Sequence, residues 1–204
     1  MKKGQIVYIH GGSIVRNREE FYRGLHEKKY SPFVKREHWY DYADQNLSAD
    51  FDLLRLKMPN KEWYDYTAWS IWFEKTFEYL VGDKFVLIGE SLGGLFVTKY
   101  LSENKLPKKI DQLHLIAPVF DRYTVLQGAM DSEMAHNLAV LKTVNDAAEK
   151  IYLYHSTDDP AVPCEEGKKY LQYFPNAQYE EFDDRGHFFK AEFPELVDNI
   201  NKLI

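Results

Sequence analysis

Residues 85–96 constrain the fold of this chain more than any other stretch. A short apolar run ends in the pentapeptide Gly-Glu-Ser-Leu-Gly at residues 89–93, and a second apolar run with helical spacing follows at once. This pattern predicts a strand, a sharp turn and a helix, with Ser91 at the apex of the turn. Gly89 and Gly93 are expected because a Cβ at either position would collide with the neighbouring strand or helix. Ser91 is expected to have a strained backbone that pushes its Oγ out above the sheet, toward the free N–H groups of the helix.

The pentapeptide alone is a weak signal, because an idle serine in a glycine-rich turn would look the same. A serine hydroxyl is a poor nucleophile near neutral pH. It needs a base within hydrogen-bond reach and a third group that orients that base. The catalytic interpretation of Ser91 therefore depends on a histidine and a carboxylate elsewhere in the chain.

The other patterns alternate between strands and helices. We expect further strands at residues 6–9, 53–58, 110–117, 151–154 and 178–182. We expect further helices within 16–32, 33–47, 62–80, 133–148, 165–174 and 192–204. The helix within 62–80 has the strongest pattern, an apolar stripe of Trp69, Trp72, Phe73, Phe77 and Leu80. The alternation predicts one α/β domain over residues 1–204, with a mostly parallel sheet and helices on both faces.

The composition limits the classes of partner. The formal net charge of −6 argues against nucleic acid, because phosphate binding needs a basic surface. The N-terminal apolar run is too short and too polar for a signal peptide or a membrane span. Cys164 is the one cysteine in the chain, so no intramolecular disulfide can form. We therefore expect a cytoplasmic protein that does not bind membranes, and the sequence leaves its oligomeric state open.

Candidate partners for Ser91 follow two later strands. An adjacent pair, Asp158 and Asp159, comes after the strand at 151–154, and His187 comes after the last strand. Neighbouring side chains in an extended segment point in opposite directions, so one of the two carboxylates is expected to reach His187. Asp159 is preferred because it precedes Pro160 and the approach to the next helix. Asp158 stays the alternative, and either residue could instead be a turn-forming aspartate.

The remaining histidines are weaker candidates for the base. His10 precedes the elbow and is better placed to hold the glycine loop that follows the first strand. His155 lies near the carboxylates but precedes them in the chain. The others are expected to be structural or surface residues, and these are His26, His38, His114 and His136.

An oxyanion hole needs two backbone N–H donors. Leu92 follows the serine and would give one of them, and Gly12 in the loop after the first strand would give the other. Glu90 is unusual beside a nucleophile, where negative charge develops. It either faces away from the site or binds a cationic substrate group, and the first interpretation is favoured.

At this point the chain resembles the α/β-hydrolases, and more narrowly the small serine hydrolases related to retinoblastoma-binding protein nine. The resemblance covers nearly the whole chain. It rests on Met58-Pro59, the Trp-rich helix at 69–80, Ile88-Gly89-Glu90-Ser91, Ser156-Thr157-Asp158-Asp159-Pro160 with Pro163, and Gly186-His187-Phe188 followed by Phe193 and Leu196.

The resemblance implies that the second aspartate of the pair, Asp159, is the triad acid. It also implies a small or absent cap, and residues 118–148 are too few for a full one. Two features depart from the family pattern. Glu90 stands where family members often have histidine, and residues 16–32 resemble an insertion over the edge of the active site.

The sequence therefore predicts a serine hydrolase that cleaves a small ester or related acyl compound without a metal or an organic cofactor. Esterase, thioesterase and peptidase activities are not separable at this level. Aromatic residues at 21–40 hint at an apolar acyl group, although core packing explains them equally well. The alternative is a binding protein on a hydrolase fold with a vestigial triad.

Overall fold

The computed structural model describes residues 3–15, 17–29, 31–33, 37–121 and 135–204. Its centre is a six-stranded sheet of order β2-β1-β3-β4-β5-β6, in which each neighbouring pair is parallel. The strands are β1 (Gly4–Ile9), β2 (Phe51–Leu56), β3 (Lys84–Glu90), β4 (Ile110–Ile116), β5 (Ala148–Ser156) and β6 (Gln178–Phe182). The predicted α/β class with a mostly parallel sheet is confirmed.

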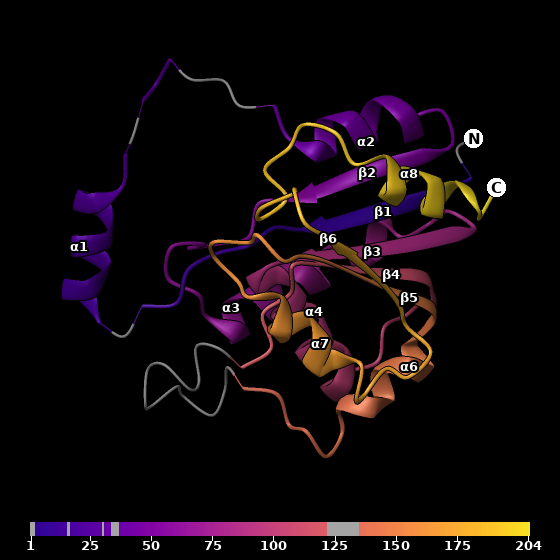
Figure 1. Ribbon diagram of the computed structural model, residues 1–204. Coiled ribbons are helices and arrows are strands. Elements are labelled where there is room, and N and C mark those ends of the chain that lie inside the picture. The colour runs from indigo at the N-terminus through magenta and orange to yellow at the C-terminus, as the bar shows by residue number, and fades with distance from the viewer. Residues whose placement is uncertain (1–2, 16, 30, 34–36, 122–134) are drawn as a thin grey trace.

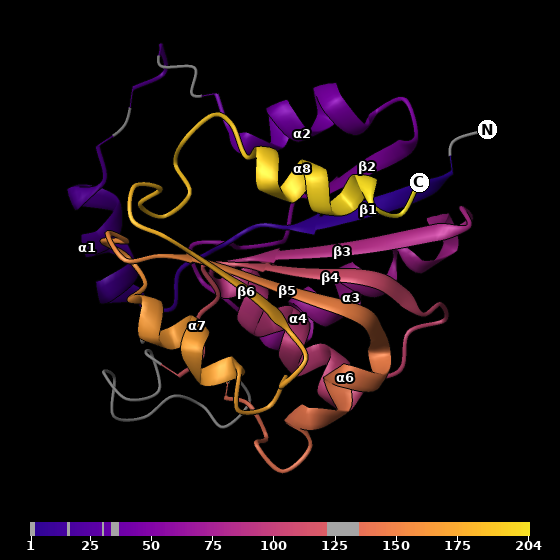
Figure 2. The same cartoon turned by 45° about the vertical axis from the view of Figure 1, so that its right-hand side comes forward.

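Helices cover both faces of the sheet (Figures 1 and 2). One face carries α2 (Trp39–Leu47) and α8 (Pro194–Asn201), and the other carries α3 (Tyr66–Glu74), α4 (Leu92–Glu103), α6 (Val144–Ala147) and α7 (Cys164–Tyr170). Successive strand residues alternate between these two layers, as the pleat requires. Val7 and Leu87 pack under α4, whereas Ile6 and Val86 pack under α2 and α8. Burial on both faces explains the continuous apolar runs at 6–9 in β1 and 85–88 in β3.

The sheet has a topological switch point between β1 and β3. The chain runs from β1 out to the edge strand β2 and then returns to place β3 on the other side of β1. In open parallel sheets, ligands bind in the crevice at such a point, beyond the carboxyl ends of the strands. Ile9 pairs with Gly89 in this register. The glycine loop after β1 and the turn after β3 therefore start side by side.

A helix within the predicted 16–32 segment is present as α1 (Arg18–Glu27), and the Asn17 side chain caps it by accepting the Glu20 N–H at 2.9 Å. Figure 1 shows α1 standing away from the sheet on the side where the strands end. None of its residues is buried. Its contacts with the body include the Phe21–Trp63 ring pair and, at the C-cap residue, the Lys28–Glu62 ion pair. The segment thus lies at the edge where ligands would enter.

Some predicted element boundaries are wrong. The helix within 62–80 ends at Glu74, because the Thr76 hydroxyl and N–H both bind the Phe73 carbonyl, and a short 3-10 turn, η1 (Phe77–Tyr79), follows. Trp69 and Phe73 are buried, but Trp72 is 44% exposed and does not belong to the inward stripe.

Two further predictions of helical structure need correction. Of residues 133–148, only η2 (Leu141–Thr143) and α6 are helical among the described part, and 133–134 lie outside it. The Asn137 side chain accepts the Ala139 N–H and forms a turn in place of the expected helix. The helix expected within 33–47 begins only at Trp39, and Phe33 is 92% exposed. Residues 122–130, predicted as a loop, lie outside the described residues.

Candidate active site

Ser91 lies at the apex of the turn between β3 and α4, with φ 55° and ψ −120°. This is the strained backbone that the sequence predicts, since a non-glycine residue avoids positive φ unless its surroundings enforce it. Those surroundings are hydrogen bonds from β4 and the residues after it. The Ser91 N–H donates to the Ile116 carbonyl at 2.8 Å, and the Ser91 carbonyl accepts from the Val119 N–H at 3.2 Å. The residue is 8% exposed.

The two glycines that flank Ser91 are needed for the reason expected. A Cβ on Gly89 would lie 2.8 Å from the Gly93 carbonyl oxygen in α4. A Cβ on Gly93 would lie 2.4 Å from the carbonyl oxygen of Ile9 at the end of β1. Contacts this short do not occur with real Cβ atoms, so the strand, the helix and the glycine loop can meet only if both positions lack a side chain.

Asp159 and His187 are brought together in the loops after β5 and β6. The His187 Nδ1 lies 2.7 Å from Asp159 Oδ2, and the Asp159 side chain is fully buried. The other carboxylate oxygen, Oδ1, accepts the N–H groups of Ala161 and Val162 at 2.8 and 2.9 Å. Because a carboxylate can only accept, Nδ1 carries a proton and His187 is left with Nε2 as its basic nitrogen.

The neighbouring Asp158 has different partners. Its Oδ1 accepts the Ser156 hydroxyl at 2.5 Å and the Gly186 N–H at 2.8 Å. Asp158 thus ties the end of β5 to the loop that carries His187, without contacting the histidine itself. The sequence preferred Asp159 as the partner of His187, and the geometry agrees. The sequence analysis did not predict that Asp158 links these two segments, and the only signal in the sequence was that the two aspartates are adjacent.

The two residues that carry the candidate oxyanion donors are neighbours in the structure. Leu92 is the first residue of α4, so its N–H has no partner within the helix. A Cβ placed on Gly12 would lie 3.3 Å from the Leu92 side chain. A Cβ placed on Gly11 would lie 3.0 Å from Ser91 Cβ and 3.4 Å from its Oγ. The close approach of Gly11 to the serine was missed by sequence reasoning, although the double glycine after β1 was its signal.

His10 holds the glycine loop, as expected from the sequence. Its Nδ1 lies 2.5 Å from the Gly11 carbonyl oxygen, and its Nε2 accepts the Met58 N–H at 3.0 Å. The ring is therefore the neutral tautomer with the proton on Nδ1. Burial is the largest cause that lowers its pKa, which favours the same neutral form.

Glu90 faces the layer of α2 and α8, on the same side of β3 as Ile88. Its Oε2 accepts the Tyr8 hydroxyl from β1. Burial raises the pKa of this carboxyl, while the Tyr8 hydroxyl, His187 and Trp39 act in the opposite direction. Glu90 therefore points away from α4 and accepts from Tyr8, while His187 still acts on its charge, so the interpretation that it faces away from the site stays a prediction. The partnership with Tyr8 was not predicted, although both residues point to the same face of adjacent strands.

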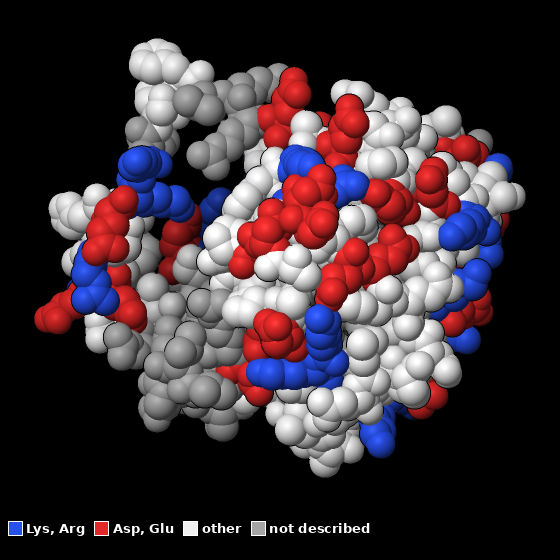
Figure 3. Space-filling model, viewed as in Figure 1, with Lys and Arg blue, Asp and Glu red and all other residues white. Residues whose placement is uncertain are grey.

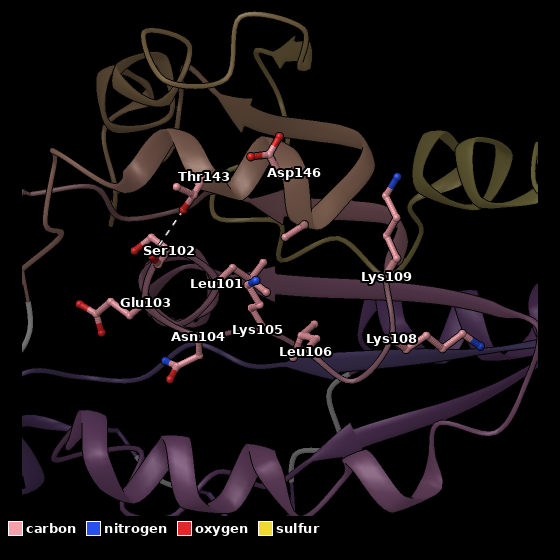
Figure 4. A pocket seen from close by; sticks show the side chains of 11 residues that line it. Leu101, Ser102, Glu103, Asn104, Lys105, Leu106, Lys108, Lys109, Thr143 and Asp146 are labelled. Atoms are coloured by element: carbon pink, nitrogen blue, oxygen red, sulfur yellow. Dashed lines mark hydrogen bonds between the residues drawn. The ribbon is translucent and has the colours of Figure 1, made fainter.

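A cavity of about 620 Å³ lies at the other end of α4, between that helix, the loop that leads to β4, η2 and α6 (Figure 4). With α4 spanning 12 residues at about 1.5 Å rise each, it lies on the order of 18 Å from Ser91 along the helix. The Thr143 hydroxyl donates to the Ser102 carbonyl across it at 3.4 Å. This cavity does not serve the serine.

Among the described residues, no group of three or more His, Cys, Asp or Glu side chains could hold a metal ion. None of the helices in the described ranges combines the length and apolarity that crossing a bilayer requires. On the face shown in Figure 3, carboxylates are interspersed with lysines and arginines and form the larger share of the charged surface.

Known structures share this fold. The product of the ydeN gene from B. subtilis is 19% identical, with a TM-score of 0.73 over 98% of this chain and 97% of that one. Est1E from Butyrivibrio proteoclasticus is 14% identical, with a TM-score of 0.63 over 99% and 87%. The esterase Pf2001 from Pyrococcus furiosus is 17% identical, with a TM-score of 0.57 over 98% and 80%. No curated protein sequence matches this chain.

At these identities the similarity establishes an α/β-hydrolase fold without a large cap in the described part of the chain. The narrower resemblance to retinoblastoma-binding protein nine stays a prediction. The family described as serine hydrolase matches residues 34–196, which include the elbow, both aspartates and His187. Because that match spans most of the 204 residues, the chain belongs to the serine hydrolase family.

Proposed function

We propose that the protein hydrolyses a small ester or related acyl compound through a Ser91–His187–Asp159 triad and an acyl-enzyme intermediate. The observation that carries the proposal is the hydrogen bond of 2.7 Å between His187 Nδ1 and the buried Asp159 carboxylate. It joins loops that follow β5 and β6, on the same edge of the sheet as Ser91. A histidine oriented in this way has its second nitrogen available as a base.

In the first half of the reaction, Ser91 Oγ attacks the carbonyl carbon of the substrate and its proton passes to His187 Nε2. The Asp159 carboxylate stabilises the imidazolium that forms, without taking the proton itself. The carbonyl oxygen becomes an oxyanion as its double bond opens. His187 then gives the proton to the leaving oxygen, the bond to the leaving group breaks, and the acyl group stays on Ser91.

The N–H groups of Leu92 and Gly12 are the proposed donors to the oxyanion. Leu92 begins α4, so its N–H lies at the positive end of that helix, where negative charge is favoured. Gly12 lies against the Leu92 side chain, on the loop that His10 holds. Both donors belong to the backbone, so they are in place before the substrate binds.

In the second half, water replaces the leaving group. His187 takes a proton from the water as its oxygen attacks the acyl carbon, and then returns that proton to Ser91 Oγ as the acid product leaves. These steps use only groups of this chain together with water. We further propose that the enzyme needs no cofactor and that its substrate is a small molecule rather than a nucleic acid. We also propose a cytoplasmic location, and this part rests on the single, buried Cys164.

The choice of an ester over other acyl compounds draws on the structural neighbours. Est1E has been crystallised with ferulic acid, and Pf2001 is described as an esterase. Acyl transfer by this constellation is not limited to oxygen leaving groups, so thioesters and amides belong in the test panel. The neighbours guide the first substrate tried and do not define the natural one.

The test compares native protein with the Ser91→Ala variant. Turnover of p-nitrophenyl acetate should fall by about 10⁴-fold or more, because the nucleophile is lost while the fold is kept. Fluorophosphonate labelling, with the adduct located by mass spectrometry, should mark Ser91 in native protein only. Unchanged hydrolysis in the variant, or a folded native protein with no adduct at Ser91, would instead favour a binding protein with a vestigial triad.

A further inference from the structure

His155 is a buried histidine that the proposed reaction does not use. It lies near the end of β5 and faces α7, on the same side of the strand as Leu153. Its Nε2 lies 2.9 Å from the carbonyl oxygen of Val162 and 3.7 Å from Asp159 Oδ2. Its Nδ1 is buried and has no hydrogen-bond partner among the described residues. The side chain therefore lies beside the triad acid, near the same carboxylate oxygen that His187 contacts.

The contacts define the protonation state of the ring. A carbonyl oxygen can only accept, so Nε2 must carry the proton. Nδ1 faces Gly167 of α7, where an added Cβ would lie 2.6 Å away, and no acceptor is present to hold a second proton. Burial and the nearby His187 lower the pKa of His155, against the opposing effects of Val162, Asp159 and Glu165. The ring is neutral and donates through Nε2.

Val162 is held at both of its backbone polar groups. Its N–H donates to Asp159 Oδ1 at 2.9 Å, and its carbonyl accepts from His155 Nε2 at 2.9 Å. The oxygen of Asp159 that binds His187 is also the one nearest to His155. A displacement of Val162 would therefore move the carboxylate, and with it the hydrogen bond to His187.

We propose that His155 is a positioning residue for the triad acid, a neutral N–H donor that fixes Val162 and thereby holds the Asp159 carboxylate in line with His187. This inference rests on the proposed function, since Asp159 matters to turnover only if the triad operates. His155 touches neither the substrate nor the nucleophile. It acts only through Asp159.

The first test compares His155→Phe with His155→Gln. Phenylalanine fills the space but leaves the Val162 carbonyl without a donor, whereas the glutamine amide can supply an N–H near the position of Nε2. We expect kcat to fall about 10- to 100-fold in the phenylalanine variant, because small displacements of a catalytic group cost that much, with KM nearly unchanged. Glutamine should restore most of the loss. A native kcat in folded His155→Phe would overturn the proposal.

The second test is a double-mutant cycle with Asp159→Asn. If His155 acts through the acid, His155→Phe should lower kcat in native protein but have little further effect once the acid is gone. A general loss of folded structure would instead lower kcat by the same factor in both backgrounds. Equal factors in the two backgrounds would contradict the proposal.

Gly167→Ala supplies a perturbation that leaves His155 and the triad unchanged in sequence. The new Cβ would press on Nδ1 of His155, so kcat should fall as it does in His155→Phe. Gly24→Ala is the matched control, because Gly24 lies in α1 with nothing within 4 Å of the added Cβ. A fall in Gly24→Ala as large as that in Gly167→Ala would contradict the assignment.

A readout that needs no turnover separates this inference from the proposed function. The His187 Nδ1 proton is held by Asp159, and its exchange with solvent can be followed by NMR in native protein. Exchange should be faster in His155→Phe and slow again in His155→Gln. If Ser91 takes no probe but this pattern appears, the proposed function fails and the positioning role stands. Equal exchange in all three proteins would overturn the positioning role even in an active enzyme.

Discussion

Replacing Asp159 with asparagine is the substitution in the proposed triad whose effect can be derived in most detail from the structure. The two oxygens of this carboxylate have different partners: Oδ1 accepts two backbone N–H groups and Oδ2 accepts from His187. In the variant, the amide oxygen must occupy the Oδ1 position, because an amide nitrogen there would face two donors. The amide NH2 group therefore points at His187 Nδ1.

The consequence is a change of tautomer. With a donor facing it, Nδ1 of His187 must accept, so the ring proton moves to Nε2. A protonated Nε2 cannot take the proton of Ser91. The corresponding change in serine proteases lowers kcat by about 10⁴-fold with the geometry intact, which equals about 5.4 kcal/mol of barrier. We expect a loss of this size, with little change in folding stability because the Oδ1 contacts persist.

The assay is steady-state hydrolysis of p-nitrophenyl acetate together with the rate of fluorophosphonate labelling, and Asp158→Asn is the matched control. Asparagine at 158 can still accept the Ser156 hydroxyl and the Gly186 N–H through its amide oxygen. We expect kcat to fall by no more than about fivefold in this control, because one altered hydrogen bond changes the barrier by about 1 kcal/mol. Near-native turnover in Asp159→Asn, or an equal loss in both variants, would refute the reasoning.

Two further changes test the elbow and the buried layer. Gly93→Ala should abolish labelling of Ser91 and destabilise the protein by roughly 1–3 kcal/mol, because the new Cβ would overlap the Ile9 carbonyl at 2.4 Å; native labelling and melting temperature would contradict this. Burial lowers the pKa of His114 to about 3, so the unfolded chain, whose histidines titrate near 6.5, takes up the proton first as pH falls. His114 should therefore lower the free energy of unfolding below about pH 6.5, by about 1.4 kcal/mol per pH unit. When the free energy of unfolding is measured with urea between pH 7 and 5, it should fall less steeply with decreasing pH in His114→Gln than in native protein. An equal pH dependence in the two proteins would count against burial of a neutral ring.

The fold could be predicted from the sequence because its signals are local. The apolar runs at 6–9, 85–88 and 151–154 became strands, as expected where a parallel sheet is buried on both faces. The apolar run at 138–141 did not, and it forms a turn and the start of η2. The elbow glycines were predictable for a similar reason, as only glycine fits where α4 crosses the end of β1. The predicted end of a helix was wrong where a polar side chain that is not part of the apolar stripe terminates it. Thr76 does this by donating its hydroxyl to the Phe73 carbonyl.

The contacts within the site were predictable only in part, because they join residues that lie far apart in the chain. Chain order indicated Ser91, Asp159 and His187, but no sequence pattern relates Tyr8 to Glu90, 82 residues apart, or assigns Asp158 to Gly186. Glu90 looked anomalous because its neighbours in sequence are the nucleophile and the elbow. In space its neighbours are Tyr8 and the α2 layer, so its carboxylate is accounted for by a hydroxyl donor.

His155 extends this argument. In sequence it is a competitor for the role of base, placed four residues before the acid. In the fold, the period of two along β5 turns it toward α7, where Gly167 leaves room for the ring and the Val162 carbonyl accepts the hydrogen bond of its Nε2–H. The position four residues before the acid, which argues against His155 as the base, therefore places its ring beside Asp159. A histidine near a triad acid can thus support that acid without being the base, and the partner of its N–H, a carbonyl in this case, distinguishes the two roles.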